Sequence, residues 1–339
     1  MIRRAATCLI LALGALTAQN VPFRVQTQVV QVPVSVTDKE GRGVDGLVAS
    51  DFTLLDQGVP QPVTVDDFST GLAPISLAIL IQTSGISTPA LAKIRTIGGM
   101  IQPLVTGARG AVAIVTFDSR IRWVQDFTSD DDKIRSAVKS LRPGWDIAGA
   151  RMLDAVAVVA DRLRQRPGRR MLLLISENRD RGSKTTIQQA LEAVARQGIE
   201  IFGAHYSAYA TSLIAKPKDL PNLSGPPEFP DDPTDAPNPP PSLDFMAIFT
   251  ELARLGKTNA VLALTRATGG MDYPFLRERG IENAIEKLGL EVHSQYILSF
   301  QQPKDAEGLR KVEVSVPARP DLRIRSRQTY WAEPPADAQ

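Results

Sequence analysis

Residues 77–87 read LAILIQTSGIS, an apolar run followed at once by a short polar loop. The run from Leu77 to Ile81 shows no alternation, which is typical of a strand buried on both faces of a parallel sheet. Gln82 to Ser87 then precede a helical pattern, so this loop lies where open α/β sheets place ligands, outside the carboxyl ends of their strands. The segment therefore predicts both a fold class and the position of a candidate site.

Apolar runs alternate with amphipathic helical stretches from residue 72 to residue 301. This order predicts a doubly wound, mostly parallel α/β sheet with helices on both faces. Residues 120–127 follow the second strand after a two-residue turn, which indicates a hairpin at the sheet edge. The predicted strands are 77–81, 112–117, 171–175, 199–204 and 296–300, and the predicted helices are 91–105, 129–141, 153–163, 187–198, 245–268 and 276–290.

Both flanks of this region carry strand patterns and turn signals in place of helical ones, as at Asp56-Gln57-Gly58. We expect these flanks to pair in one small all-β domain, with the α/β domain inserted between them. The predicted organisation is a signal peptide at 1–18, an N-terminal β segment at 21–71, the α/β domain at 72–301 and a C-terminal β segment at 302–333 that pairs with 21–71.

The first 18 residues have the pattern of a secretory signal. Arg3 and Arg4 precede an uncharged apolar run of 14 residues, and a cleavage site is acceptable after Ala18. The run is shorter than the roughly 20 residues of a spanning helix. We predict a secreted or periplasmic, cell-envelope protein with no membrane span after cleavage, the alternative being an uncleaved anchor. Cys8 lies inside this run, so the mature chain has no cysteine for disulfides or metal sites.

Composition narrows the class of partner. The 339 residues include 39 basic and 37 acidic ones, a net charge of +2 that provides no general attraction to nucleic acid.

Residues 216–242 contain ten of the 25 prolines and are predicted to form a proline-rich insertion. This insertion overhangs the edge that holds Gln82 and Ser84, presents a polyproline ligand to a partner, or is a tolerated disordered segment.

Three sequence features imitate catalytic sites and are not assigned to one. Ser136 and Lys139 spell S-x-x-K but lack the partner motifs of acyl-enzymes. Gly256-Lys257-Thr258 lacks the earlier glycine of a phosphate loop. His205 and His293 are the only histidines, which leaves little material for a triad or a zinc site. We predict that the chain is not an enzyme, and a hydrolase with a non-standard site is the alternative.

The loop after Ile81 resembles the metal-ion-dependent adhesion site (MIDAS) of the von Willebrand factor type A (VWA) family. That family has D-x-S-x-S where this chain has Q-T-S-G-I at 82–86. Residues 149–155, GARMLDA, resemble its G-T-x-L-x-D-A segment, and 173–180, LLISENRD, resemble its L-I-S-D-G-x-D segment. The β-rich flanks are similar to those of secreted VWFA-related proteins first grouped from acidobacteria. The resemblance implies a Rossmann-like fold and a role in protein binding, adhesion or scaffolding.

Carried over residue by residue, this metal site is degenerate. The five aligned positions hold Gln82, Ser84, Ile86, Ala150 and Glu177. Magnesium favours octahedral oxygen ligands with one or two carboxylates, so we expect no metal and no cofactor. The alternative is weak Mg²⁺ or Mn²⁺ binding through Ser84 and Glu177. The polar groups considered as compensation are Ser87, Asp146 and Asp180.

Two further expectations concern these positions. Gln82 and Glu177 are expected to hydrogen-bond each other and so to satisfy both side chains without an ion. The partner implied by the resemblance is a protein in the envelope or extracellular space. A VWA protein with a rebuilt divalent-metal site, a hydrolase and a purely structural envelope protein are the alternatives.

Overall fold

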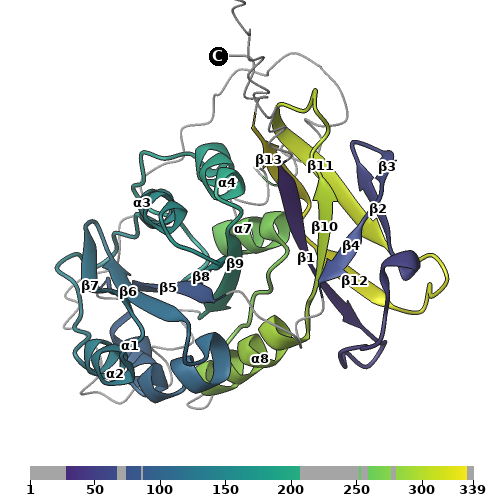
Figure 1. Cartoon of the computed structure of the whole chain (residues 1–339). Coiled ribbons are helices and arrows are strands. Elements are labelled where there is room, and N and C mark those ends of the chain that lie inside the picture. The colour runs from purple at the N-terminus through teal and green to yellow at the C-terminus, as the bar shows by residue number, and fades with distance from the viewer. Residues whose placement is uncertain are drawn as a thin grey trace, which may run out of the picture.

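The structure is a computed structural model that describes residues 28–66, 74–84, 87–206, 252, 259–275 and 280–333. The predicted signal peptide and the proline-rich segment at 216–242 lie outside these ranges. The described residues form an α/β unit and a β unit that pack side by side (Figure 1).

The α/β unit contains a five-stranded sheet in the order β7-β6-β5-β8-β9. Its strands are β5 (Ile75–Gln82), β6 (Ala111–Phe117), β7 (Ile121–Thr128), β8 (Arg169–Ser176) and β9 (Glu200–His205). All are parallel except β7, which runs antiparallel to β6 at the edge. The predicted doubly wound sheet and its hairpin edge are therefore confirmed.

Helices cover both faces of this sheet (Figure 1). One face packs on α1 (Thr88–Ile94), α2 (Asp131–Lys139) and α8 (Gly280–Ser294), and the other on α3 (Met152–Arg164), α4 (Ile187–Arg196) and α7 (Ala260–Thr268). Successive side chains of a strand point to opposite faces, so Ile79 enters the first of these cores and Leu80 the second. This two-sided burial explains the unbroken apolar run of β5.

The long helix predicted over 91–105 is wrong. Helix α1 ends at Ile94, and short helical turns at Ile97–Gly99 and Gln102–Thr106 follow it. Two glycines at 98 and 99 and a proline at 103 interrupt the stretch, and both residue types disfavour a helix interior. A Cβ on Gly98 would lie 3.0 Å from the Cα of Arg135, so the glycine also permits close packing against α2.

The β unit consists of two four-stranded antiparallel sheets in the orders β12-β1-β10-β4 and β13-β11-β2-β3. Its N-terminal strands are β1 (Val29–Thr37), β2 (Thr53–Asp56), β3 (Val59–Gln61) and β4 (Thr64–Asp66). Its later strands are β10 (Tyr296–Gln301), β11 (Gly308–Ser315), β12 (Arg323–Ser326) and β13 (Thr329–Ala332). Strand β1 pairs with β12 and β2 pairs with β11, so the predicted union of the two chain ends is confirmed.

The strand predicted at 296–300 lies in a different sheet from the one expected. The predicted boundary at residue 301 assigns it to the α/β domain, whereas β10 pairs with β1 on one side and β4 on the other. An apolar run has the same pattern in either sheet, and only strand pairing distinguishes the two.

A buried ion pair connects three strands of the β unit. Asp56 on β2 is fully buried, and its carboxylate receives two parallel hydrogen bonds from Arg310 on β11, from Nε and Nη2 at 3.0 Å each. The hydroxyl of Tyr330 on β13 donates to the same carboxylate at 3.0 Å. Paired in this way, the buried charge of Asp56 is stable, but removing Arg310 would leave it without a counter-charge.

We therefore predict that Asp56→Asn lowers the free energy of unfolding by about 2 kcal/mol, since it leaves the partly buried Arg310 without its counter-charge. Urea unfolding measures this loss. The matched control is Asp321→Asn, which breaks the exposed pair with Arg319 and should leave the free energy of unfolding nearly unchanged. Equal losses in the two variants would contradict the role given to the Asp56 cluster.

Candidate functional site

Gln82 ends β5 and lies fully buried at the carboxyl edge of the sheet. Its Oε1 accepts a hydrogen bond from the backbone N–H of Glu177 at 3.0 Å, and its Nε2 donates to Ser84 Oγ at 2.7 Å. Ser84 Oγ lies 3.3 Å from Ser87 Oγ. The amide thus uses both of its polar ends, and it links the end of β5 to the segment that follows β8.

The expected bond between the Gln82 and Glu177 side chains is replaced by one to the Glu177 backbone. The Glu177 carboxylate instead lies 3.2 Å from Nη1 of Arg181, and the same Nη1 donates to the carbonyl of Ala148 at 3.4 Å. The backbones of Ala150 and Arg181 exchange two hydrogen bonds, of 3.1 and 2.8 Å. This backbone pairing holds the Arg181 guanidinium beside Glu177, which is the only acidic residue among the five positions aligned with the MIDAS.

The residues present do not fit a divalent metal. The Gln82 oxygen is occupied by a backbone N–H, Ala150 offers no side-chain oxygen, and Arg181 already neutralises Glu177. Glu177 Oε2 has no hydrogen-bond partner among the described residues, but Nη1 of Arg181 lies 3.2 Å from it, and a hard cation needs several free oxygen ligands. Ile86 lies outside the described residues. Within those described, no group of three or more His, Cys, Asp or Glu residues is placed to hold a metal ion.

The three groups considered as compensation serve local structure. Ser87 belongs to the Ser84 network. Asp146 accepts hydrogen bonds from the N–H groups of Ala148 and Gly149, and the bond from Gly149 is the main cause that lowers its pKa. Asp180 accepts from Leu153 N at 2.9 Å, near the start of α3, and from a nearby serine hydroxyl.

A tryptophan that the sequence analysis did not select stands beside this edge. The Trp145 side chain is 82% exposed and Ile147, two residues on, is 53% exposed. Their loop is anchored beneath them, because Gly144 N donates to Thr83 O and Trp145 N donates to the buried Asp118 carboxylate at 3.0 Å. The sequence does carry a signal for this position. Two large apolar residues lie in a loop that begins with Pro143-Gly144 and directly precedes the segment at 149–155.

Glycine is required at the anchor of this loop. A Cβ on Gly144 would lie 2.0 Å from Asp118 Oδ2 and 3.1 Å from Thr83 O. The close approach of the backbone therefore fixes the loop to the ends of β5 and β6. Hydrogen bonds hold the 144–149 loop at both of its ends. Gly144 and Trp145 are bonded as described above, and the N–H groups of Ala148 and Gly149 donate to the Asp146 carboxylate.

The other candidates from the sequence do not assemble into a reactive centre. Ser136 and Lys139 are both exposed on α2. His205 ends β9, and its Nδ1 lies 2.7 Å from Asp272 Oδ2. His293 lies in the last turn of α8, and the Gly256-Lys257-Thr258 motif falls outside the described residues.

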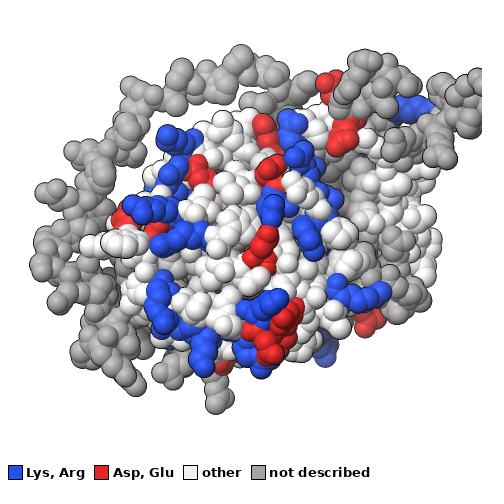
Figure 2. Space-filling model, turned by 60° about the vertical axis from the view of Figure 1, so that its left-hand side comes forward, with Lys and Arg blue, Asp and Glu red and all other residues white. Residues whose placement is uncertain are grey.

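Basic and acidic side chains are interspersed on the surface of the described residues that Figure 2 shows. Figure 2 shows Lys and Arg side chains scattered over one face, with acidic side chains and uncharged surface between them. Within the ranges that the structure describes, no helix has the length and apolar character needed to cross a membrane.

Comparisons with known proteins give structural likenesses alone. No protein-family model matches the chain, and no curated protein matches it significantly. The chain is similar to an aerotolerance-related membrane protein of Bacteroides fragilis, with 12% identity and a TM-score of 0.41 over 63% of this chain and 98% of that one. It is similar to BatB of Bacteroides thetaiotaomicron, with 15% identity and a TM-score of 0.38 over 63% and 98%.

A third similar structure is the vWF domain of the type V pili tip protein Mfa5 from Porphyromonas gingivalis. It shows 16% identity and a TM-score of 0.28 over 33% of this chain and 40% of that one. It bears the name of the family that the sequence resembles. At these TM-scores the likeness carries no conclusion about function.

Asp154 connects the start of α3 to the loop that follows β8. Its carboxylate accepts from Thr185 N at 2.8 Å, from Thr185 Oγ1 at 2.6 Å and from Lys184 N at 3.1 Å, and it pairs with Arg151. Burial by itself raises the pKa of Asp154, but the hydrogen bonds from Thr185, Lys184 and Arg151 outweigh it and lower the pKa to about 2.

The depressed pKa makes stability depend on acid pH. The charged form of Asp154 stabilises the fold above its ordinary pKa of 3.8, and this contribution disappears as the pH falls from about 4 to about 2. We predict that Asp154→Asn lowers the free energy of unfolding by about 2 kcal/mol at pH 7 and has little effect at pH 2. Urea unfolding across this range measures it. Asp161→Asn, at an exposed position of the same helix, is the control, and a loss that persists at pH 2 would contradict the assignment.

Proposed function

We propose that this chain is an exported, non-enzymatic binding module that holds a protein partner at the carboxyl edge of its α/β sheet without a metal ion. The observation that carries the proposal is the exposed pair Trp145 and Ile147, on a loop hydrogen-bonded to Thr83 and Asp118. Export rests on the sequence pattern of residues 1–18.

The apolar pair has the properties of an interface anchor. Tryptophan dominates the energetics of many interfaces because it buries a large area when it enters a pocket on the partner. The backbone of the 144–149 loop is already fixed by its hydrogen bonds, so binding orders little additional chain. Large apolar side chains exposed on a fixed loop are therefore better explained by a partner than by the stability of the free protein.

The polar network beneath the loop supports a metal-independent mode. Gln82 and Ser84 bond to each other, and Arg181 supplies the positive charge next to Glu177. The same network disfavours the hydrolase alternative. The Ser84 hydroxyl is bonded to the Gln82 amide and to the Ser87 hydroxyl, and those of Thr83 and Ser176 donate to backbone carbonyls. None of these bonds supplies the general base that a nucleophile needs.

We predict that the immobilised mature protein captures a partner from envelope extract equally well in EDTA and in Mg²⁺. Trp145→Ser should weaken the apparent affinity for that partner about tenfold or more, as expected for an aromatic anchor. Quantitative mass spectrometry over a series of bait concentrations measures both effects.

The matched control is Leu290→Ser, which removes a 74% exposed apolar side chain from α8 and should leave capture unchanged. Capture that EDTA abolishes would show that the site requires a metal. Capture that survives Trp145→Ser but not Leu290→Ser would place the interface elsewhere.

Calorimetric titration tests directly whether the site binds a divalent metal ion. We predict no binding of Mg²⁺ or Mn²⁺ at millimolar concentration by the wild-type protein. The variant Gln82→Asp, Ile86→Ser, Ala150→Thr, Arg181→Gln should gain measurable affinity, because it restores a carboxylate and two hydroxyls and removes the competing cation. Micromolar binding by the wild type that Glu177→Ala abolishes would overturn the proposal.

A further inference from the structure

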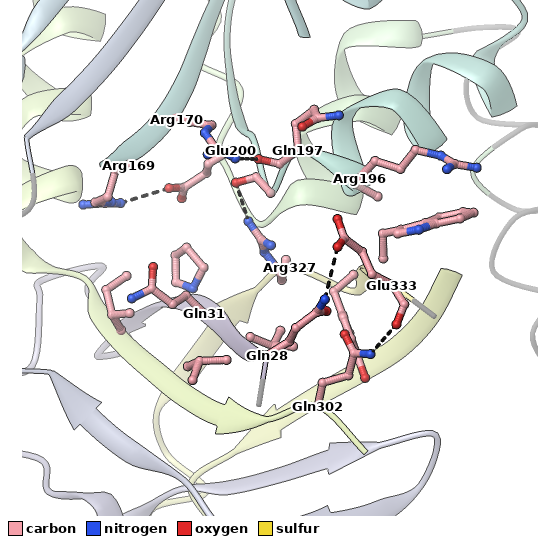
Figure 3. Close-up of a pocket in the computed structure, with 18 of the residues that line it drawn as sticks. Gln28, Gln31, Arg169, Arg170, Arg196, Gln197, Glu200, Gln302, Arg327 and Glu333 are labelled. Carbon is pink, nitrogen blue, oxygen red and sulfur yellow. Dashed lines mark hydrogen bonds and ion pairs between the residues drawn. The ribbon is translucent and has the colours of Figure 1, made fainter. Parts of the chain in front are cut away.

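A cavity of about 530 Å³ lies at the opposite end of the sheet from the candidate site. Arg169 and Arg170 begin β8 and Glu200 begins β9, so these lining residues stand at the amino ends of the strands. The far wall comes from β1 and β13 of the β unit. Figure 3 shows Arg327 labelled between these two walls. The volume falls in the range of small-molecule sites.

The cavity carries an excess of positive charge. Four arginines and two glutamates line it, namely Arg169, Arg170, Arg196, Arg327, Glu200 and Glu333. Glu200 is already satisfied, because one oxygen accepts from Arg169 at 3.0 Å and the other from Gln295 at 2.6 Å. Glu333 is exposed and accepts from Gln28 at 3.1 Å. Among the described residues, no carboxylate forms an ion pair with any of the other three arginines.

Arg327 is the buried cation of this group. It is only 6% exposed, and its Nη2 donates to the carbonyl of Gly198 at 3.0 Å. Its Nε has no hydrogen-bond partner in the part of the chain that the structure describes. Burial lowers the pKa of Arg327, and although Glu200 opposes this effect Arg169 adds to it. A guanidinium nevertheless remains charged, so its burial is costly when no described carboxylate forms an ion pair with it, unless a ligand supplies that charge.

The other two arginines are held at the same cavity from the α/β side. Arg170 donates from Nη1 to the carbonyl of Gln197 at 2.9 Å, which fixes its position without neutralising it. The guanidinium carbon of Arg196 lies 3.5 Å from the centre of the Trp331 ring, a cation–π contact between α4 and β13. Neither contact supplies a negative charge, and each holds its side chain in place before any ligand arrives.

We propose that this cavity binds a small anionic molecule whose carboxylate or phosphate group is held by Arg327, with Arg170 and Arg196 as further cations of the lining. Arginine suits such groups because its planar fork matches two oxygens at once. Amide side chains of the lining, including those of Gln28, Gln197 and Gln302, provide further hydrogen bonds to the rest of the ligand. Because the lining comes from both units, the bound ligand also bridges them.

The test uses the full mature protein with two simple probes, inorganic phosphate and acetate, against chloride at matched ionic strength. We expect at least one probe to raise the melting temperature in a saturable, millimolar range, since a ligand that binds the native state stabilises it. The probe with the lower midpoint identifies the group, phosphate or carboxylate. Arg327→Met should remove this response while its own melting temperature without probe stays the same or rises.

Two further variants keep the test decisive. Arg196→Gln, at an exposed position, should weaken the response several-fold, and it carries the test if Arg327→Met does not fold. Arg319→Gln removes an exposed arginine that pairs with Asp321 and should leave the response intact. The proposal is overturned if both probes act no differently from chloride, or if Arg327→Met and Arg196→Gln respond like the wild type.

Discussion

All eight residues of β5 are buried, with a parallel strand on each side and helices on both faces. A polar side chain at the end of such a strand remains shielded from water and must find its partners inside the protein. Gln82 does so through the Glu177 backbone and the Ser84 hydroxyl. The burial of this one strand therefore determines the chemistry of the edge at which it ends.

The choice of an amide at position 82 has a direct electrostatic consequence. An amide both donates and accepts, so it can join a backbone N–H to a hydroxyl and needs no counter-charge. A carboxylate at the same point would only accept, and it would need a cation nearby. The positive charge at this edge is instead provided by Arg181, which is bonded to Glu177 and to the loop at 144–149. The edge is thus a polar network beneath an exposed apolar loop, and Glu177 Oε2 has no hydrogen-bond partner in it among the described residues.

The opposite end of the sheet is organised by the β unit. The chain between β12 and β13 brings Arg327 against Gly198, and Arg325 pairs with Glu291 and Ser35 close by. Charged groups at this junction belong to segments that are far apart in the sequence and meet only when both units are folded. In our proposals the two ends of one sheet therefore serve different ligands, a protein surface at one and a small anion at the other.

The sequence by itself determined the alternation of strands and helices, the hairpin at β7, the union of the chain ends and the position of the Gln82 loop. These features follow from periodicity and turn residues, which report local burial. The apolar periodicity did not predict the end of α1 at Ile94. Apolar residues continue at helical spacing beyond it, but two glycines and a proline interrupt the helix. Only the tertiary structure decided that β10 joins the β unit, that Arg181 lies beside Glu177 and that Arg327 is buried without an ion pair to any described carboxylate. Such facts depend on pairing between distant residues, as between Gln82 and Glu177, 95 positions apart, and no local pattern encodes the partner.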